Sequence, residues 1–223
     1  EEHEAPMLSL DKTKDVGALQ EWLGSQKGIL SWKLDGLTIV LTYEGGELVK
    51  AVTRGNGEIG EVITGNARVF ANVPLRISYQ GTLIIRGEAV IKYSDFARIN
   101  EEIEDVDARY KNPRNLCSGS VRQLNNQITA QRNVHFEAFM LVRADGVDFG
   151  NSRKRQFQWL ESQGFDVVEY QEVDTESLPE AVSVFAEKIQ TYDIPSDGLV
   201  LLMDDIAYGD SLGRTAKFPR NSI

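Results

Sequence analysis

A glycine turn between two β-favouring segments is the feature that most constrains how this chain can fold. The stretch ILSWKLDGLTIVLTY begins at Ile29, ELVKAVTR begins at Glu47, and EGG lies between them. β-Branched and aromatic residues favour strands, and paired glycines suit a tight turn. The sequence therefore predicts a β-hairpin whose first arm is one strand running through KLDG.

Further strand-like and helix-like segments follow without a regular alternation. We expect strands at 83–91, 134–142, 167–173 and 196–203, and helices within 11–26, at 95–104 after a Ser94 cap, between Ser152 and Gly164, and after a capping box at Ser177–Glu180. Residues 109–132 are polar and interrupted by NPRN and SGS. Strands grouped into hairpins with helices between them favour an α+β fold with mainly antiparallel sheets over a doubly wound parallel sheet.

Length, charge and cysteine content narrow the class of protein. The 223 residues suit one domain, or one domain with a small appendage, and they contain no apolar run that could span a bilayer and no signal-peptide pattern. Cys117 is the single cysteine, which excludes a disulfide framework within the chain. The formal net charge is −10, so binding of phosphate or nucleic acid must be local. We expect a cytoplasmic protein, a monomer, and a chain excised from a longer one.

Lys33 and Asp35 stand two residues apart in the predicted strand. Side chains alternate along a strand, so the two would point to one face and could serve one site. A lysine amine is almost fully protonated at neutral pH, and a nucleophilic lysine therefore needs desolvation or nearby cations. The competing interpretation is an exposed salt bridge near the turn.

RGEAVI contains a second pair of this kind. Arg86 and Glu88 share one strand face, and the apolar residues between and around them occupy the other. A carboxylate on such a face can bind a ribose hydroxyl or a metal ion, although an ion pair with Arg86 is the commoner explanation. In NPRNLCSGSVRQL, Arg114 and Arg122 could contact phosphate or decorate a surface.

The order of these motifs along the chain resembles the bacterial NAD-dependent DNA ligases. The motifs are PMLSLDKT, KLDG, TRGNGEIGEVIT, RGE, NPRNLCSGSVRQL, SDGLVLL and LGRTAKFPR. TRGNGEIGE and NPRNLCSGSVRQL are specific to this family, since ATP-dependent ligases and capping enzymes share little beyond K-x-D-G. The resemblance implies a nucleotidyltransferase fold of the ligase and capping-enzyme type, similar to ATP-grasp. Residues 28–223 would form an adenylation domain truncated before its last motif, and residues 1–27 would connect it to an upstream nicotinamide-binding segment.

The resemblance also implies a reaction and a set of site residues. Lys33 would attack the α-phosphate of NAD, release nicotinamide mononucleotide and carry AMP, which then passes to the 5′-phosphate of nicked double-stranded DNA, with Mg²⁺ screening the phosphates. No residue is singled out as a metal ligand. The residues expected to act with Lys33 are Asp35, Arg54 and Glu88 in catalysis, Ser9, Leu10, Arg54, Glu88 and Asp197 in nucleotide binding, and Arg114, Arg122 and Lys217 in support of phosphate or DNA.

Four positions depart from the family pattern. Ser31 stands where the family has a glutamate, Leu202 where it has a lysine, and Asn56 and Val62 where it has aspartates. These departures keep an alternative open, namely a degenerate relative that binds nucleotide or nicked DNA without efficient self-adenylation. We favour the active enzyme because the other expected site residues are all retained.

Overall fold

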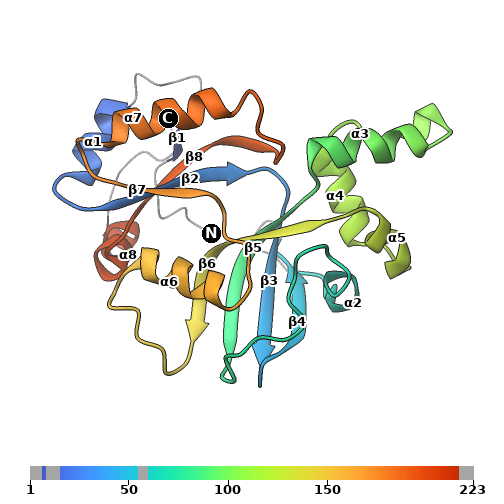
Figure 1. Ribbon diagram of the computed structural model, residues 1–223, viewed down its shortest axis with the longest axis horizontal. Helices are drawn as coiled ribbons and strands as arrows, with labels where there is room; N and C mark the ends of the chain where they lie inside the picture. Colours follow the sequence, from blue (N-terminus) through green and yellow to red (C-terminus); the bar gives the residue numbers. More distant parts are fainter. Residues whose placement is uncertain (1–6, 9–15, 55–59, 216–223) are drawn as a thin grey trace.

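Two four-stranded antiparallel sheets form the centre of the molecule (Figure 1). The computed structural model describes residues 7–8, 16–54 and 60–215. The first sheet has the order β1-β8-β2-β7 and the second β4-β3-β5-β6. The strands are β1 (Met7–Leu8), β2 (Gly28–Leu34), β3 (Leu37–Glu44), β4 (Glu47–Thr53), β5 (Leu83–Val90), β6 (His135–Ala144), β7 (Tyr170–Val173) and β8 (Ser196–Met203). The predicted α+β fold with mainly antiparallel sheets is confirmed.

Helices pack around both sheets and at one end of the second. They are α1 (Val16–Leu23), α2 (Thr64–Ala67), α3 (Tyr93–Glu102), α4 (Pro113–Val121), α5 (Asn126–Gln131), α6 (Arg153–Ser162), α7 (Leu178–Lys188) and α8 (Ile206–Thr215), with a short 3₁₀ helix at Val106–Ala108. Helices α1 and α7 lie against the first sheet, whereas α3, α4 and α5 gather at one end of the second (Figure 1). None of the described helices combines the length and hydropathy needed to cross a membrane.

Each sheet has its own hydrophobic core. In the first, Trp32 of β2 packs edge-on against Phe185 of α7, with ring centroids 4.8 Å apart, and stacks on Tyr192 at 4.6 Å. In the second, Tyr43 and Phe136 are among the largest fully buried side chains. Aromatic burial of this kind fixes how helices sit on a sheet, because such rings remove large apolar areas from water.

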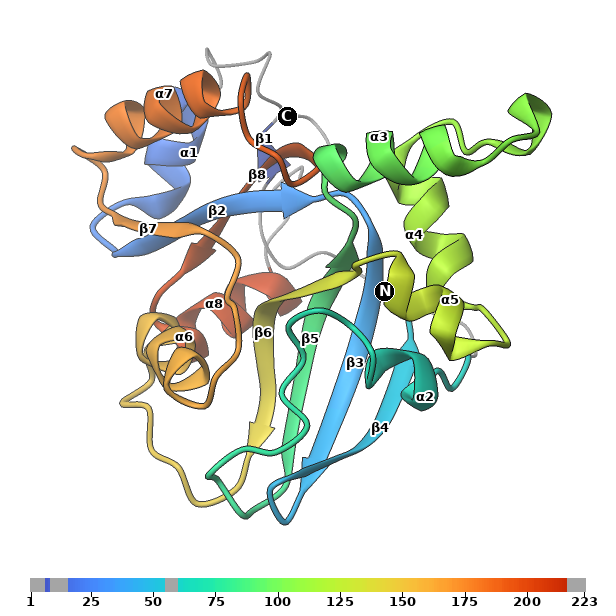
Figure 2. The same ribbon diagram turned by 45° about the vertical axis from the view of Figure 1, so that its right-hand side comes forward.

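The predicted single strand through KLDG is two strands that belong to different sheets. The chain leaves β2 after Leu34 and enters β3 at Leu37, and Figure 2 shows the sharp turn between them. The backbone N–H of Asp35 donates to the carbonyl of Pro195 over 2.8 Å. A Cβ at Gly36 would lie 2.0 Å from the carbonyl oxygen of Ala89, so a side chain there would force the backbone to move. The glycine therefore lets the chain pass over the end of β5, and it places Lys33 close to the junction of the two sheets.

The hairpin itself is confirmed between β3 and β4. Gly45 and Gly46 form its turn, with φ of +59° and +82°. Positive φ at both central residues is the requirement of a type I′ turn, which follows the twist of the paired strands. The expected strands at 83–91, 134–142, 167–173 and 196–203 correspond to β5, β6, β7 and β8.

The predicted helix caps have mixed outcomes. The helix expected after Ser152 is α6, and Ser152 caps it, since its hydroxyl accepts a hydrogen bond from the Arg155 N–H over 3.2 Å. Ser94 does not cap α3, because that helix begins at Tyr93 and the Ser94 hydroxyl donates to Asp193. Ser177 occupies the predicted N-cap position of α7, but its side chain makes no capping hydrogen bond to the helix. It exchanges hydrogen bonds with Asp174 one turn earlier, Asp174 Oδ1 accepting from its N–H over 2.8 Å.

The polar segment 109–132 contains two helices that the sequence did not indicate. Helix α4 begins after Asn112, whose side chain accepts a hydrogen bond from the Asn115 N–H, and Pro113 occupies the first turn. Pro is favourable there because its missing N–H would have no partner in the helix. Leu116 and Val121 are fully buried against the second sheet. Tertiary packing thus stabilises a helix whose serines and glycine resemble a loop.

Candidate active site

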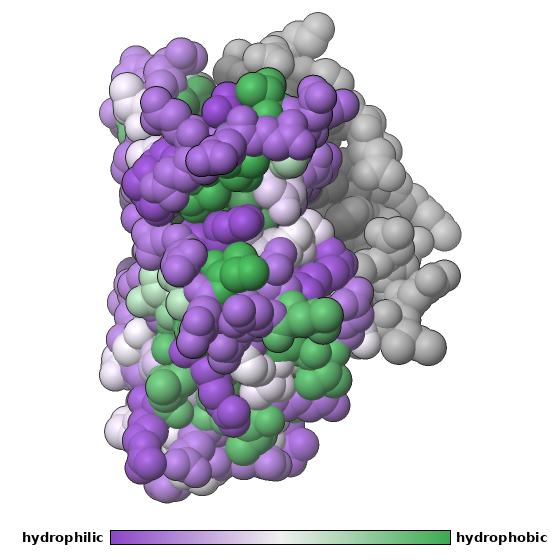
Figure 3. All heavy atoms as spheres, turned by 90° about the vertical axis from the view of Figure 1, so that its right-hand side faces the viewer, coloured by the Kyte–Doolittle hydropathy of each residue, from purple (hydrophilic) through white to green (hydrophobic). Residues whose placement is uncertain are grey.

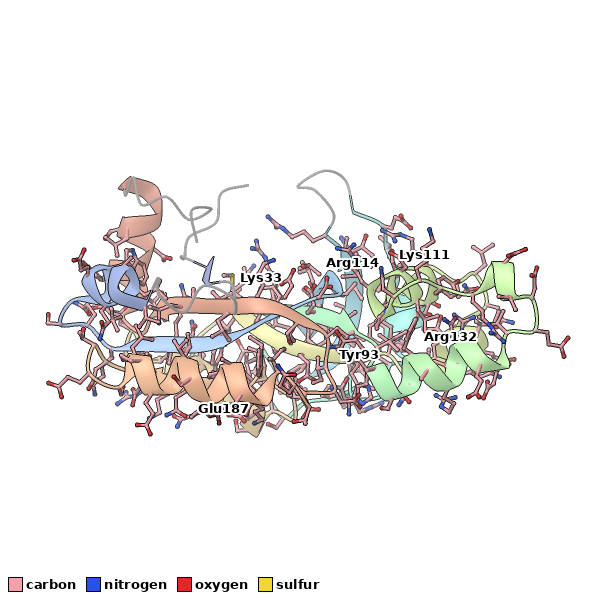
Figure 4. The ribbon with its side chains drawn as sticks, turned by 90° about the horizontal axis from the view of Figure 1, so that it is seen from above. Lys33, Tyr93, Lys111, Arg114, Arg132 and Glu187 are labelled. Carbon is pink, nitrogen blue, oxygen red and sulfur yellow. The ribbon has the colours of Figure 1, made fainter. Side chains whose placement is uncertain are left out.

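Lys33 lies near the end of β2 and pairs with Asp197 of β8. Its Nζ is 3.2 Å from each carboxylate oxygen of Asp197, and 39% of its side chain is exposed. Figure 4 shows Lys33 and Arg114 on the same side of the molecule, opposite Glu187. The amine is therefore both fixed in direction and accessible to a ligand.

Asp35 follows β2 and pairs with Arg114 rather than with Lys33. The Arg114 Nη1 is 3.7 Å from Asp35 Oδ1. The ion pair between Lys33 and Asp35 that the sequence left open as an alternative does not form, because Lys33 turns to Asp197. This second ion pair links the N-terminal end of α4 to the chain that connects the sheets.

Glu88 of β5 accepts two hydrogen bonds from the residues that join β2 to β3 and begin β3. The Gly36 N–H donates to its Oε2 over 3.0 Å, and the Thr38 hydroxyl donates to its Oε1 over 2.8 Å. Burial raises the pKa of Glu88 to about 7, against the opposing effect of these hydrogen bonds, while the Asp35 charge raises the pKa further and the Lys33 charge lowers it. Lys33, Asp35 and Glu88 therefore share one electrostatic environment.

The ion pair between Arg86 and Glu88 that the sequence left open as an alternative does not form in this structure. Arg86 instead directs Nη1 toward the Met140 sulfur at 3.9 Å. Arg54, at the end of β4, donates its backbone N–H to the Thr38 carbonyl over 2.8 Å. Burial and the nearby Arg86 guanidinium lower the pKa of Arg54. Two guanidinium groups in one neighbourhood repel each other, and an anion placed between them would relieve that repulsion.

Arg114 lies in the first turn of α4, and Arg122 is the residue that ends this helix eight positions later. The Arg122 Nε donates to Glu61 Oε1 over 2.9 Å, and its Nη1 donates to the Ser118 hydroxyl. Arg114 thus belongs with the cluster around Lys33, whereas Arg122 lies farther along the helix. Ser9, Leu10, Asn56 and Lys217 fall outside the described residues.

Two residues that complete the cluster were missed by the sequence analysis. Thr38 binds Glu88, and Gly36 contributes its N–H to the same carboxylate. The pairing of Thr38 with Glu88 depends on the register of β3 against β5. Only the glycine of KLDG offered a signal, because a glycine within a strand-like run often marks a tight bend or a close approach of another backbone.

Two departures from the family pattern lie on the Lys33 face of the first sheet. Ser31 is buried and faces Val200 across β2 and β8, and Leu202 faces Ile29. Leu202 is half-buried, whereas its neighbours Leu201 and Met203 are buried in the core of this sheet. Leu202 therefore points away from that core and toward the side that carries Lys33.

The carboxylates near Lys33 suit a magnesium ion only in part. Asp35 and Asp197 are each paired with a cation, and Glu88 accepts two hydrogen bonds. Within the described ranges, no three histidine, cysteine, aspartate or glutamate side chains gather as a metal site. Mg²⁺ commonly uses one or two carboxylates together with substrate phosphates. This arrangement fits a magnesium ion that arrives with a nucleotide.

The raised pKa of Glu88 leads to a testable pH dependence. The folded protein holds a proton on Glu88 between its ordinary pKa of 4.5 and about 7, so the free energy of unfolding falls as pH rises through that window. Glu88→Gln cannot ionise, and it should gain about 1 to 3 kcal/mol relative to the parent protein between pH 4.5 and pH 8. Urea unfolding at both pH values measures this gain.

The control for this test is Glu187→Gln on the exposed surface of α7 (Figure 4). Burial also raises the pKa of Glu137 to about 7. Comparing each variant with the parent at the same pH cancels that second titration. An equal effect of both substitutions, or no change between the pH values for Glu88→Gln, would contradict the buried-carboxylate interpretation.

Comparisons with known proteins identify the family of this chain. All residues 1–223 match the family described as "NAD-dependent DNA ligase adenylation domain". A curated DNA ligase of Ruminiclostridium cellulolyticum is 68% identical over the whole chain, and one of Lachnoclostridium phytofermentans is 66% identical. The chain spans 34% of the length of each of these relatives.

A solved structure named "Pmar-Lig_Pre." shares the fold, with a TM-score of 0.52 at 12% identity. The match covers 85% of this chain and 41% of that chain. Because the family match extends over every residue and the two curated relatives align over the full chain, this protein belongs to the family of NAD-dependent DNA ligase adenylation domains.

Proposed function

We propose that Lys33 is the nucleophile that accepts AMP from NAD. The observation that carries this proposal is the position of its amine, directed by Asp197 and lying in the same electrostatic environment as Glu88 and Asp35. The Lys33 ammonium leaves its ion pair and gives a proton to water, and the resulting amine forms a bond to the α-phosphorus of NAD. The bond from that phosphorus to the oxygen of nicotinamide mononucleotide breaks, and the electron pair leaves with that product.

The surrounding residues have separate roles in this proposal. Glu88 accepts a hydrogen bond from a ribose hydroxyl, and Arg54 with Arg86 attracts the nucleotide phosphates. Asp197 pairs with the Lys33 ammonium before the reaction, and its carboxylate balances the positive charge. Ser9 and Leu10 border the adenosine, and Lys217 supplies further positive charge. A magnesium ion would stabilise negative charge on the phosphates when the nucleotide is bound.

In the following steps, AMP passes to the 5′-phosphate of nicked double-stranded DNA, and the 3′-hydroxyl then displaces AMP. Arg114 and Arg122 support this DNA, because guanidinium groups bind phosphate with two hydrogen bonds. Residues 28–223 form the catalytic unit, and residues 1–27 connect it to a segment that binds the nicotinamide half of NAD. We place the protein in the cytoplasm and expect a monomer.

A second candidate function is supported by Leu202. An apolar side chain on the Lys33 face offers no charge to a phosphate, which suits a relative that binds nucleotide or nicked DNA without efficient self-adenylation. We favour the active enzyme because Asp197 holds the Lys33 amine in the electrostatic environment of Glu88, which simple nucleotide binding does not require.

Intact-mass analysis tests the proposed function. The full-length ligase that carries this domain should gain one AMP when it is incubated with NAD and magnesium, and ATP should give no adduct. Addition of nicked duplex should then remove the adduct and yield sealed DNA. The same adduct from ATP would refute the NAD dependence, and binding of nucleotide without any adduct would favour the degenerate relative.

A further inference from the structure

Leu124 is an apolar residue that the site described above leaves without a role. It lies between α4 and α5, and its exposed fraction is 104%, against 67% for Val62 and 51% for Leu75. Isolated exposed leucines are common on protein surfaces. Leu124 differs in two respects. The backbone on both sides of it is held by hydrogen bonds, and it follows two arginines, Arg114 and Arg122, along the chain.

The loop that carries Leu124 is held on both sides by side-chain hydrogen bonds. The Asn66 Nδ2 donates to the carbonyls of Val121 over 2.6 Å and of Gln123 over 2.8 Å. Asn125 caps α5 by accepting from the Gln127 N–H over 3.0 Å. The residues before and after Leu124 are therefore fixed by the fold, although the leucine itself contributes no buried area. An exposed apolar side chain on a backbone held in this way is preorganised to contact another molecule.

The first of the two arginines belongs with the cluster around the nucleophile. Arg114 pairs with Asp35 in the first turn of α4, and Arg122, which pairs with Glu61, is the residue that ends the helix eight positions later. Leu124 comes two residues after Arg122. Figure 4 shows Arg114 and Lys111 on the side of the molecule that carries Lys33. Figure 3 shows the face over α3, α4 and α5 as largely hydrophilic, with separate hydrophobic spots.

We infer that Leu124 inserts into the minor groove of the duplex beside the nick and packs against its sugars, while Arg114 and Arg122 bind the flanking phosphates. This inference rests on the proposed function, in which the same face receives nicked DNA. The local cations complement phosphate although the chain carries a net charge of −10. Leucine is among the apolar residues that proteins insert into the minor groove. Packing against the sugars there would add apolar contact without adding charge.

The test compares Leu124→Ser with Leu75→Ser in the full-length ligase. Both substitutions replace an exposed leucine, but Leu75 lies in the segment between α2 and β5, where its carbonyl accepts from the Leu48 N–H. Fluorescence anisotropy with nicked duplex over a range of salt gives the affinity and its salt slope. Leu124→Ser should weaken binding about tenfold with an unchanged slope, since no ionic contact is removed. Leu75→Ser should bind as the parent does.

Two further variants sharpen the result. Leu124→Met keeps an apolar side chain and should restore most of the affinity. Arg122→Gln should instead reduce the magnitude of the salt slope by about one, because it removes one phosphate contact. These two changes separate apolar contact from charge.

Three outcomes would overturn the inference. Unchanged affinity of Leu124→Ser for nicked duplex would refute the contact, as would equal losses for Leu124→Ser and Leu75→Ser. A lower melting temperature or altered sedimentation of Leu124→Ser without DNA would assign the leucine to a contact within the protein or between copies. Because DNA affinity is measured without turnover, a ligase that fails to self-adenylate would refute the proposed function and still test Leu124.

Discussion

Lys33→Arg should abolish the AMP adduct in the full-length ligase. Arginine keeps the positive charge and can still pair with Asp197, but its guanidinium does not lose a proton at accessible pH and cannot act as the nucleophile. We expect no adduct by intact mass after incubation with NAD and magnesium, which corresponds to a loss of more than about a thousandfold in the adenylation rate.

The matched control is Lys50→Arg, which makes the same change at an exposed residue of β4. This variant should form the adduct at the parental rate. Peptide mapping of the parental adduct should place AMP on Lys33. An adduct on Lys217, or one that persists in Lys33→Arg, would show that another lysine is the nucleophile.

Leu202→Lys should speed self-adenylation by about tenfold or more, since about 1.4 kcal/mol of transition-state stabilisation gives that factor. Leu202 is half-buried on the Lys33 face, opposite Ile29, which precedes Lys33 by four residues or roughly 13 Å along the strand. Two long lysine side chains that converge on a phosphate from these positions can both reach it. A preorganised positive charge there would stabilise negative charge as the α-phosphate reacts.

Single-turnover adenylation rates and thermal melts on the same protein test this prediction. Leu202→Met serves as the control, because it retains an apolar side chain of similar volume without charge. If Leu202 instead packs as core, the unpaired ammonium would lower the melting temperature strongly. A slower or unchanged rate in a lysine variant that melts normally would contradict the view that Leu202 marks a missing phosphate contact.

Local sequence patterns determined much of the secondary structure. The β3–β4 hairpin was predicted because paired glycines supply the positive φ that its turn needs. The alternation of β5 was visible in RGEAVI, where Arg86 and Glu88 leave the opposite face to Ile85 and Ala89. A helix after Ser152 was predicted as well, and the Ser152 hydroxyl caps it. Each of these features depends on residues that are neighbours in the chain.

The candidate nucleophile was also accessible from sequence, through the order of the motifs around Lys33. The residues that pair with it could not be identified from the sequence. The pairing of Lys33 with Asp197 depends on β2 lying beside β8, across 164 residues of chain, and the binding of Thr38 to Glu88 depends on the register of β3 and β5. Residue spacing carries no information on which distant strands pair.

Helix α4 and the break after Leu34 show the same limit. The serines and Gly119 of α4 favour a loop by local propensity, and the burial of Leu116 and Val121 against the second sheet overrides that preference. The sequence by itself determined which residues could carry charge, turn the chain or react. Only the tertiary structure decided which of them meet, because burial and strand pairing bring together groups that the chain keeps far apart.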